Sequence, residues 1–230
     1  VLKTIDITKD VEDITKKVSI KNTSFNVLIS GMDSYGTINK TTRNDVKMIA
    51  TINPNTNKVL LTSIPRDYYV QLHGKTGYKD KLTHAGIYGI NTVVQTIEDL
   101  FGIDINYYVR VNFTTVESLV NTIGPIEIYS DKAMSLDGCK YVVGTNTVNG
   151  KCALRFARER HSYVEGDNHR IKNQQEVIKG IFNKLSKSAM VVTDYTSILD
   201  SLDGKFATNM DMKDITAFIK YELEDITKYE

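Results

Sequence analysis

The sequence has almost no excess charge, no long apolar run and no familiar nucleotide-binding loop. Its 230 residues include 29 Lys and Arg against 28 Asp and Glu, a net charge of +1. Because long-range attraction to nucleic acid requires many excess positive charges, this balance argues against a nucleic-acid partner. No stretch is apolar for long enough to span a bilayer, and no signal-peptide pattern opens the chain. A glycine-rich phosphate loop and a serine–histidine nucleophile motif are also absent.

Cysteine is scarce as well, because the chain has only Cys139 and Cys152. Two cysteines without companion ligands argue against a zinc site. They flank the turn-rich segment KYVVGTNTVNGK, in which a hairpin would bring the two side chains together. A disulfide fits a protein outside the cytoplasm, and two buried thiols fit the sequence equally well, so both interpretations stay open.

The remaining composition is that of one large α/β domain. The chain has 41% apolar residues, and its length allows a full hydrophobic core. Residues 1–23, rich in Lys, Thr and Asp, are expected to form an N-terminal stalk or edge segment. Residues 24–230 are expected to form the main domain, since no repeat or linker interrupts them.

Strand and helix patterns alternate through this domain. The predicted elements are a buried strand 24–32, a hairpin of strands 45–54 and 57–65, a helix 82–100 ended by Gly102, a strand 105–112, a helix 113–123, a strand 125–130 and a mostly helical C-terminal third from about residue 149. The hairpin is antiparallel, whereas the later strands are connected through helices. The sequence therefore predicts an α/β fold, a single-domain α/β/α sandwich with a central mixed β-sheet flanked by helices.

The strongest chemical signal is a group of charged residues in RFARERHSYVEGDNHRIKNQQ. Arg158 and Arg160 share a face if their segment is extended. Asp167, Arg170 and Gln174 are spaced i, i+3 and i+7, so they share one face of a helix that opens at residue 166. Guanidinium groups form paired, charge-assisted hydrogen bonds to phosphate oxygens. This segment is therefore predicted to hold an anion.

Two aspartates mark the ends of neighbouring predicted strands. Asp33 ends the first strand and Asp45 opens the next, so antiparallel pairing would bring the two carboxylates together. Magnesium in proteins is usually held by one or two carboxylates together with substrate phosphates and water. The pair predicts a Mg²⁺ site, for which Mn²⁺ is a substitute.

Further cations lie near the same strand ends, where ligands of such sheets usually bind. Arg43 stands just ahead of the second strand, and Arg66 follows the third. With Asp67, Arg66 is either a second phosphate clamp or half of a surface ion pair. Lys81, before the predicted helix, either reaches the same site or is simply solvated.

The other charged groups also have plainer interpretations as surface residues. A charge run is commonly a solvated, salt-bridged helix start, and an aspartate after a strand commonly caps a loop. On this alternative the pairings are Arg158 and Arg160 with Glu159 and Glu165, Asp45 with Arg43, and Asp33 with its own loop.

Seven segments, in this order, resemble the LytR-CpsA-Psr family of Gram-positive cell envelopes. Together they cover about residues 25 to 185, and their combination is more specific than any one of them. The segments are FNVLISGMDS, TRNDVKMIATINP, VLLTSIPRDYYV, KLTHAGIYG, VNFTTVESLVNTIG, VNGKCALRFARER and GDNHRIKNQQ.

The resemblance implies roles for individual residues. The magnesium carboxylates of the family fall on Asp33 and Asp45. Its pyrophosphate-binding arginines fall on Arg43, Arg66, Arg158, Arg160 and Arg170, with Gln174 and Lys81 as supporting contacts. The sequence departs from the family pattern at His169, where glycine is usual, and at Asn173, where arginine is frequent. The second departure removes one positive charge, which bears on phosphate affinity and acceptor preference.

The resemblance also implies a reaction. A phosphotransferase of this family moves a glycopolymer, such as a teichoic acid or a capsule polysaccharide, from a polyprenyl pyrophosphate carrier onto a peptidoglycan hydroxyl. Magnesium and the catalytic arginines Arg43, Arg66, Arg158 and Arg160 would stabilise the transferring phosphoryl group. A carboxylate, from Asp33, Asp45 or Asp167, would accept the hydroxyl proton.

The same resemblance implies a cell-membrane location, with an N-terminal single-pass anchor and the domain outside the cell. The chain starts without a methionine, which is expected if an upstream anchor has been removed. Two other functions use the same residues. One is a polyprenyl-pyrophosphate hydrolase with water as the acceptor, and the other is a non-catalytic polyprenyl-phosphate-binding regulator of envelope assembly.

Overall fold

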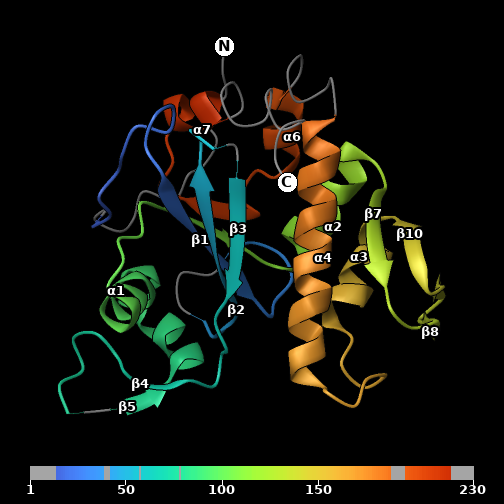
Figure 1. Ribbon diagram of the computed structural model, residues 1–230, viewed down its shortest axis with the longest axis horizontal. Coiled ribbons are helices and arrows are strands. Elements are labelled where there is room, and N and C mark those ends of the chain that lie inside the picture. Colours follow the sequence, from blue (N-terminus) through green and yellow to red (C-terminus); the bar gives the residue numbers. More distant parts are fainter. Residues whose placement is uncertain (1–13, 39–41, 57, 78, 188–194, 219–230) are drawn as a thin grey trace. The chain divides into compact units, whose positions relative to one another are not determined.

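The computed structural model describes residues 14–38, 42–56, 58–77, 79–187 and 195–218 (Figure 1). These residues form two compact units. The first unit runs to Thr114 and resumes at Asp203, and the second unit spans Thr115–Leu202. None of the helices in the described part is both long and apolar enough to cross a membrane.

A five-stranded mixed sheet is the centre of the first unit. Its strands, in their order across the sheet, are β11 (Phe206–Thr208), β6 (Tyr107–Val111), β1 (Phe25–Met32), β2 (Asn44–Asn53) and β3 (Lys58–Ser63). β1 runs parallel to β6, and the other neighbours are antiparallel. The predicted mixed sheet and the predicted β2–β3 hairpin are therefore confirmed.

The local sequence explains these strands. β1 is a nearly unbroken apolar run because it lies between two other strands and both of its faces are covered. The turn after β2 is held by Asn53, whose side-chain oxygen accepts hydrogen bonds from the backbone N–H groups of Asn55 and Thr56. Such a side-chain turn favours a tight hairpin.

Helices cover both faces of this sheet. On one face, Leu28 and Ile49 pack with residues of the 3₁₀ helix η1 (Leu82–Tyr88) and of α1 (Ile90–Phe101). On the other face, the ring of Phe25 meets the ring of Phe218, the last residue of α7 (Met212–Phe218). Helix, sheet and helix thus form three layers in the first unit, as the predicted fold class requires.

The single helix predicted over 82–100 is wrong in one respect, because Gly89 divides it. Gly89 has φ 101°, which a helix does not tolerate, so η1 ends there and α1 begins at the next residue. Gly102 ends α1 as predicted, in the left-handed conformation with its N–H bonded to the Glu98 carbonyl. In η1, a side chain at Gly86 would lie 2.3 Å from the Thr42 carbonyl oxygen, so only glycine fits.

Residues 14–23 belong to the segment predicted as a stalk or edge, whose residues 1–13 lie outside the described residues. They lie along the first unit: Ile20 is buried, and the Val18 carbonyl accepts a hydrogen bond from the Tyr107 hydroxyl at 2.8 Å. The boundary at residue 23 stays a prediction.

The expectation of a mostly helical C-terminal third omitted β11, which pairs with β6 at the edge of the sheet. The part of the predicted final helix beyond residue 218 lies outside the described residues.

The second unit has smaller sheets and one long helix, α4. Its elements are the greater part of α2 (Phe113–Ile123), β7 (Ile126–Ser130), β8 (Met134–Leu136), β9 (Cys139–Tyr141), β10 (Gly144–Val148), α3 (Gly150–Arg158), α4 (Asp167–Ser186) and α6 (Tyr195–Ser201). β7 pairs with β10, and β8 pairs with β9, both antiparallel. α4 lies against β7 at Gly180, where a Cβ atom would come within 2.4 Å of the Glu127 carbonyl oxygen.

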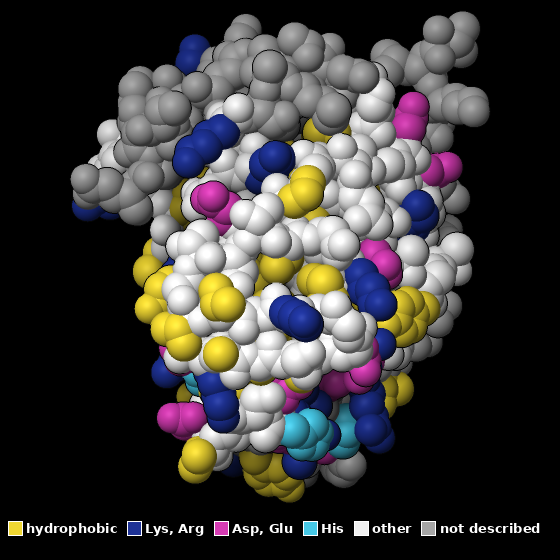
Figure 2. Space-filling model, turned by 90° about the vertical axis from the view of Figure 1, so that its right-hand side faces the viewer, with side chains coloured by type: hydrophobic (Ala, Val, Ile, Leu, Met, Phe, Trp, Pro, Cys, Tyr) yellow, Lys and Arg dark blue, Asp and Glu magenta, His cyan; other side chains and the backbone are white. Residues whose placement is uncertain are grey.

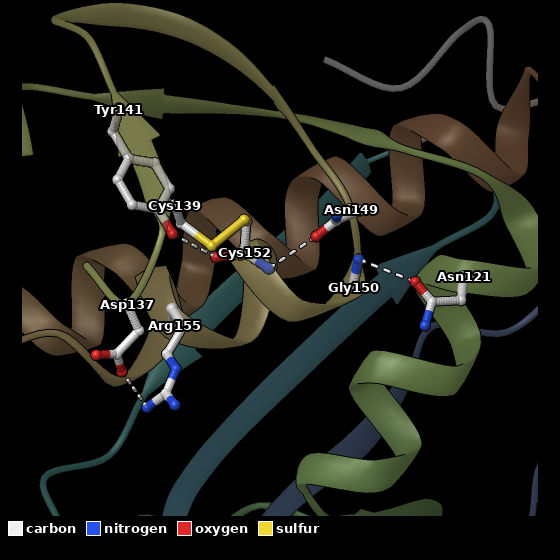
Figure 3. The surroundings of a disulfide bond; sticks show 8 residues. All are labelled: Asn121, Asp137, Cys139, Tyr141, Asn149, Gly150, Cys152 and Arg155. Atoms are coloured by element: carbon white, nitrogen blue, oxygen red, sulfur yellow. Dashed lines mark hydrogen bonds and ion pairs between the residues drawn. A yellow bond between two sulfur atoms is a disulfide. The ribbon is translucent and has the colours of Figure 1, made fainter. Parts of the chain in front are cut away.

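A disulfide connects Cys139 of β9 to Cys152 of α3, which decides between the two interpretations of the cysteines (Figure 3). The two Cα atoms are 5.5 Å apart. The Tyr141 hydroxyl donates to the Cys152 carbonyl at 2.7 Å, and the Asn149 side chain accepts from the Cys152 N–H at 3.0 Å as the N-cap of α3. The first turn of α3 is thus fixed to the β8–β9 hairpin.

One row of the central sheet is polar although it is buried. Arg110 of β6, Ser30 of β1 and Lys47 of β2 are direct neighbours across three strands and are 5%, 0% and 1% exposed. Burial lowers the pKa of Arg110 and lowers the pKa of Lys47 from 10.5 to about 7. Two buried cations are unusual in a sheet core, because desolvation disfavours the charged form.

Lys47 gives the protein a pH-dependent stability that Lys47→Met should remove. Between pH 7 and 10.5 the unfolded chain keeps a proton on Lys47 that the folded chain has lost, so this group makes stability rise with pH in that window. The advantage of Lys47→Met over wild type should be greatest below pH 7 and should shrink towards pH 10. Urea unfolding across this range measures it, with exposed Lys58→Met as a control that shows no such trend. A constant difference between wild type and Lys47→Met at every pH would contradict the prediction.

Removal of the disulfide should weaken the second unit. The disulfide closes a loop with a sequence separation of 13. A crosslink over a loop of this size should add about 3 kcal/mol to the free energy of unfolding, because it restricts the unfolded chain. We expect Cys139→Ala/Cys152→Ala to lower the free energy of unfolding by about that amount, measured by urea titration. Reductant should shift the wild-type curve and leave that of the double variant in place. If reductant leaves the wild-type curve unchanged, the prediction fails.

Candidate active site

In the first unit, a chain of charged residues begins at the second residue of β2. The Asp45 carboxylate lies 3.3 Å from Nη1 of Arg66 and accepts a hydrogen bond from the Thr83 hydroxyl at 3.1 Å. Arg66 also lies 3.6 Å from Asp67, and Asp67 lies 2.8 Å from Nζ of Lys81. Three of the predicted site residues, Asp45, Arg66 and Lys81, are therefore brought together.

A register shift in the sheet places Asp45 in this group. Met32 pairs with Asn44 and Gly31 pairs with Val46, so Asp45 is an extra residue in β2 without a partner in β1. Such a bulge changes the direction of the side chain it carries. The alternative pairing of Asp45 with Arg43 is wrong, because the carboxylate is held by Arg66 instead.

Asp33 and Arg43 lie at the same end of the β1–β2 ladder. Asp33 directly follows the last residue of β1, Arg43 directly precedes β2, and both side chains are exposed. The two predicted magnesium carboxylates, Asp33 and Asp45, thus share one end of one strand pair. No group of three or more His, Cys, Asp or Glu side chains among the described residues is placed to hold a metal ion. Two carboxylates fit an ion that takes its remaining ligands from substrate phosphates and water.

Sequence reasoning missed part of this site. It treated Asp67 as a partner of Arg66 alone, whereas Asp67 bridges Arg66 and Lys81. It did not single out Thr83, and nothing in the sequence marks this residue. Lys47 was also missed, although a lysine in the middle of the apolar strand DVKMIATI was a visible signal.

In the second unit, the end of α3 and the loop after it carry the first two arginines of the predicted anion site. Arg158 is the last residue of α3, and Glu159 follows with an extended backbone at φ −70° and ψ 131°. Arg158 and Arg160 are both exposed. The alternative partner Glu159 accepts a hydrogen bond from the Ser162 N–H at 2.7 Å. This contact closes the loop, at whose surface the two arginine side chains are exposed, and Nε of Arg160 donates to Nε2 of His161 at 3.4 Å.

The first turns of α4 carry the other three residues. The helix begins at Asp167 after Gly166, as the spacing predicted. Asp167 and Arg170 form an ion pair one turn apart, with Nη2 of Arg170 at 2.9 Å and 3.0 Å from the two carboxylate oxygens. Gln174 follows one turn later and is half-buried. The salt-bridged helix start is therefore present, and it involves residues of the predicted anion site.

The two departures from the family pattern lie on the buried side of α4. His169 is 4% exposed, and its ring stacks on Tyr163 with 3.4 Å between centroids. Its Nε2 atom lies 3.3 Å from the Asp131 carboxylate. Asn173 is 2% exposed. Both residues pack inside the second unit.

Charges of both signs also mix on the protein surface. Figure 2 shows Lys and Arg, Asp and Glu, and His side chains gathered along the lower edge of one face. Such mixing is expected from a net charge of +1. Any attraction for a polyanion must therefore come from local arrangement of the cations and not from the total charge.

Comparisons with known proteins agree with these observations. The model of the LytR_cpsA_psr family matches residues 2–228. The polyisoprenyl-teichoic acid–peptidoglycan teichoic acid transferase TagU of Enterococcus faecalis is 33% identical over 221 residues, which cover 94% of this chain and 72% of that protein.

Solved structures share the fold. The crystal structure of B. subtilis TagU has a TM-score of 0.68 at 32% identity and matches 84% of this chain and 80% of that one. A structure of TagT bound to LI-WTA has a TM-score of 0.73 at 26% identity and matches 91% of this chain and 78% of that one. The predicted α/β fold is confirmed, and the named transferase relative confirms the expectation of an enzyme. The chain belongs to the LytR_cpsA_psr family, as its motifs indicated.

Proposed function

We propose that this protein is a phosphotransferase that moves a glycopolymer from a polyprenyl pyrophosphate carrier onto a peptidoglycan hydroxyl. The observation that supports this most is the chain of contacts from Asp45 through Arg66 and Asp67 to Lys81 at the end of the β1–β2 ladder. Teichoic acid is the glycopolymer we favour over a capsule polysaccharide, because the relative with 33% identity is named as a teichoic acid transferase.

The cations of this site would bind the pyrophosphate of the carrier. Arg66 and Lys81 are held by carboxylates at 2.8–3.6 Å, in side chains that are at least a quarter exposed. A pyrophosphate offers these cations more oxygen atoms and more charge than a carboxylate does, so it can compete for them. In the first unit the proposed pyrophosphate-binding residues are Arg43, Arg66 and Lys81. In the second unit they are Arg158, Arg160, Arg170 and Gln174.

Asp33 and Asp45 would hold a Mg²⁺ ion, for which Mn²⁺ can substitute. Bound there, the ion would neutralise charge on the phosphate oxygens during transfer. The chain itself positions the reactants and stabilises charge through its guanidinium groups, which is the usual protein contribution to phosphoryl transfer.

The reaction needs a proton acceptor. The acceptor hydroxyl attacks the phosphorus nearest the sugar, the new P–O bond forms, and polyprenyl phosphate leaves. The hydroxyl proton passes to a carboxylate, and the candidates are Asp33, Asp45 and Asp167. Asp45 and Asp167 are each held in a fixed position by an arginine, Arg66 and Arg170 respectively.

The proposed location is the outer side of the cell membrane. The Cys139–Cys152 disulfide supports it, because disulfides persist outside the reducing cytoplasm. An N-terminal anchor and a peptidoglycan acceptor follow from the family resemblance. The competing functions are hydrolysis of the carrier, with water as the acceptor, and carrier binding without reaction.

The deciding experiment mixes the protein, a short polyprenyl-pyrophosphate-linked saccharide and peptidoglycan oligomers, with Mg²⁺ or with chelator. Mass spectrometry should find glycosyl phosphate attached to the oligomer, and chelator should abolish the product because the carboxylate pair then lacks its ion. Saccharide phosphate released without attachment would favour the hydrolase. An intact carrier that still binds would favour the regulator.

Arg158→Ala and Arg160→Ala should each reduce this transfer by at least about 100-fold, the effect of removing one charged group from a phosphoryl-transfer site. Both side chains are exposed, so the unfolding temperature should stay close to that of wild type. The matched control is Arg155→Ala, in the same helix, whose guanidinium pairs with Asp137 at 3.0 Å. Equal losses of activity in all three variants would contradict the assignment.

A further inference from the structure

The buried lysine Lys47 has surroundings that a structural role does not explain. Its side chain is 1% exposed in the core of the first unit. Among the described residues, no carboxylate forms an ion pair with its ammonium group, which donates a hydrogen bond to the backbone carbonyl of Asn44. Attraction to the nearby Asp45 carboxylate offsets only part of the desolvation of this lysine. A buried charge without a close ion pair disfavours folding, and an apolar side chain of similar size would do better there. Features that weaken a fold in this way are concentrated at functional sites.

The carbonyl that Lys47 binds belongs to the residue just before the bulged Asp45. Asn44 is itself 1% exposed and is tied to β1 through its side-chain amide, which donates to the Ser30 hydroxyl at 2.6 Å. The ammonium group thus holds the backbone on the N-terminal side of the bulge. The direction of the Asp45 side chain depends on that backbone.

Thr83 connects this contact to the carboxylate. Its hydroxyl oxygen lies 3.0 Å from the Asn44 carbonyl and 3.1 Å from the Asp45 carboxylate. A hydroxyl has one proton to donate, so Thr83 can serve only one of these two acceptors at a time. When Lys47 donates to the Asn44 carbonyl, the Thr83 proton is available to Asp45.

We propose that Lys47 is a positioning residue for Asp45: its ammonium group satisfies the Asn44 carbonyl, and Thr83 and Arg66 then orient the Asp45 carboxylate for the phosphate chemistry of the site. This inference rests on the proposed function. It assigns to Lys47 a role that requires no contact with the substrate. The role depends on hydrogen-bond donation by the side chain.

Two variants of equal length separate donation from packing. Lys47→Met removes the donor, and Lys47→Gln keeps an N–H donor on a side chain of the same reach as methionine. We expect Lys47→Met to lower turnover about tenfold, the loss that follows from withdrawing one hydrogen bond from a charged group. KM for the carrier should stay within about twofold, because the pyrophosphate-binding cations are unchanged. Lys47→Gln should recover most of the turnover.

A double-mutant cycle tests the route through Thr83. Thr83→Val removes the hydroxyl that links the two acceptors. If Lys47 acts through this hydroxyl, Lys47→Met/Thr83→Val should be no slower than the slower single variant, instead of showing the product of the two losses. Met48→Leu, at a fully buried neighbour in β2, is the control and should keep wild-type turnover.

The unfolding temperature at neutral pH distinguishes positioning from structural support. Lys47→Met should be at least as stable as wild type while it turns over more slowly. A variant that loses stability and activity together, wild-type turnover in Lys47→Met, or fully multiplicative losses in the cycle would each overturn the proposal.

Failure of the proposed function would be recognised separately, because wild type would then form no product. In that case crystal structures of wild type and Lys47→Met test whether Lys47 positions Asp45. Thr83 turned away from Asp45 in the variant supports the positioning role, and unchanged Thr83 and Asp45 side chains overturn it.

Discussion

The polar site of the first unit depends on the register shift between β1 and β2. A regular ladder would pair Asp45 with β1 and point its side chain according to the pleat. The extra residue breaks that alternation, so that Asp45 meets Arg66 and Thr83 while Ile49, further along the same strand, still faces the core. One insertion in one strand therefore lets the same sheet support a hydrophobic core and a charged site.

Most of the sheet could be predicted because its strands are long and their patterns are strong. β1 is a nearly unbroken apolar run, and the Asn53 turn marks the hairpin directly. β11 was missed because three residues are too few to show a period of two. The break at Gly89 was missed for a different reason. The apolar positions on either side keep helical spacing, and only the backbone angle shows that the chain leaves the helix there.

The sequence singled out Asp45, Arg66 and Lys81, which the structure brings together, but it did not give the contacts between them. Arginines and aspartates at strand ends indicate phosphate and metal chemistry by their type alone. Which carboxylate meets which cation depends on the bulge in β2 and on the antiparallel pairing of Tyr69–Gln71 with Lys79–Lys81, neither of which the sequence reveals. Asp67 shows the difference, because it binds Lys81 as well as its neighbour Arg66. The distance between the two cysteines was likewise inaccessible before the fold was known.

The position of β11 has a consequence for synthesis of the chain. Phe206 of β11 pairs with Val111 of β6, so these two strands are neighbours in the sheet. In the sequence, however, the whole second unit, Thr115–Leu202, lies between them. When the chain is delivered N-terminus first to the proposed outer side of the membrane, β6 arrives long before its outer neighbour β11, and one edge of β6 stays unpaired until the second unit has followed. An open strand edge invites pairing with other chains. Rapid folding of the inserted unit, helped by the disulfide within it, would allow β11 to pair with β6 sooner.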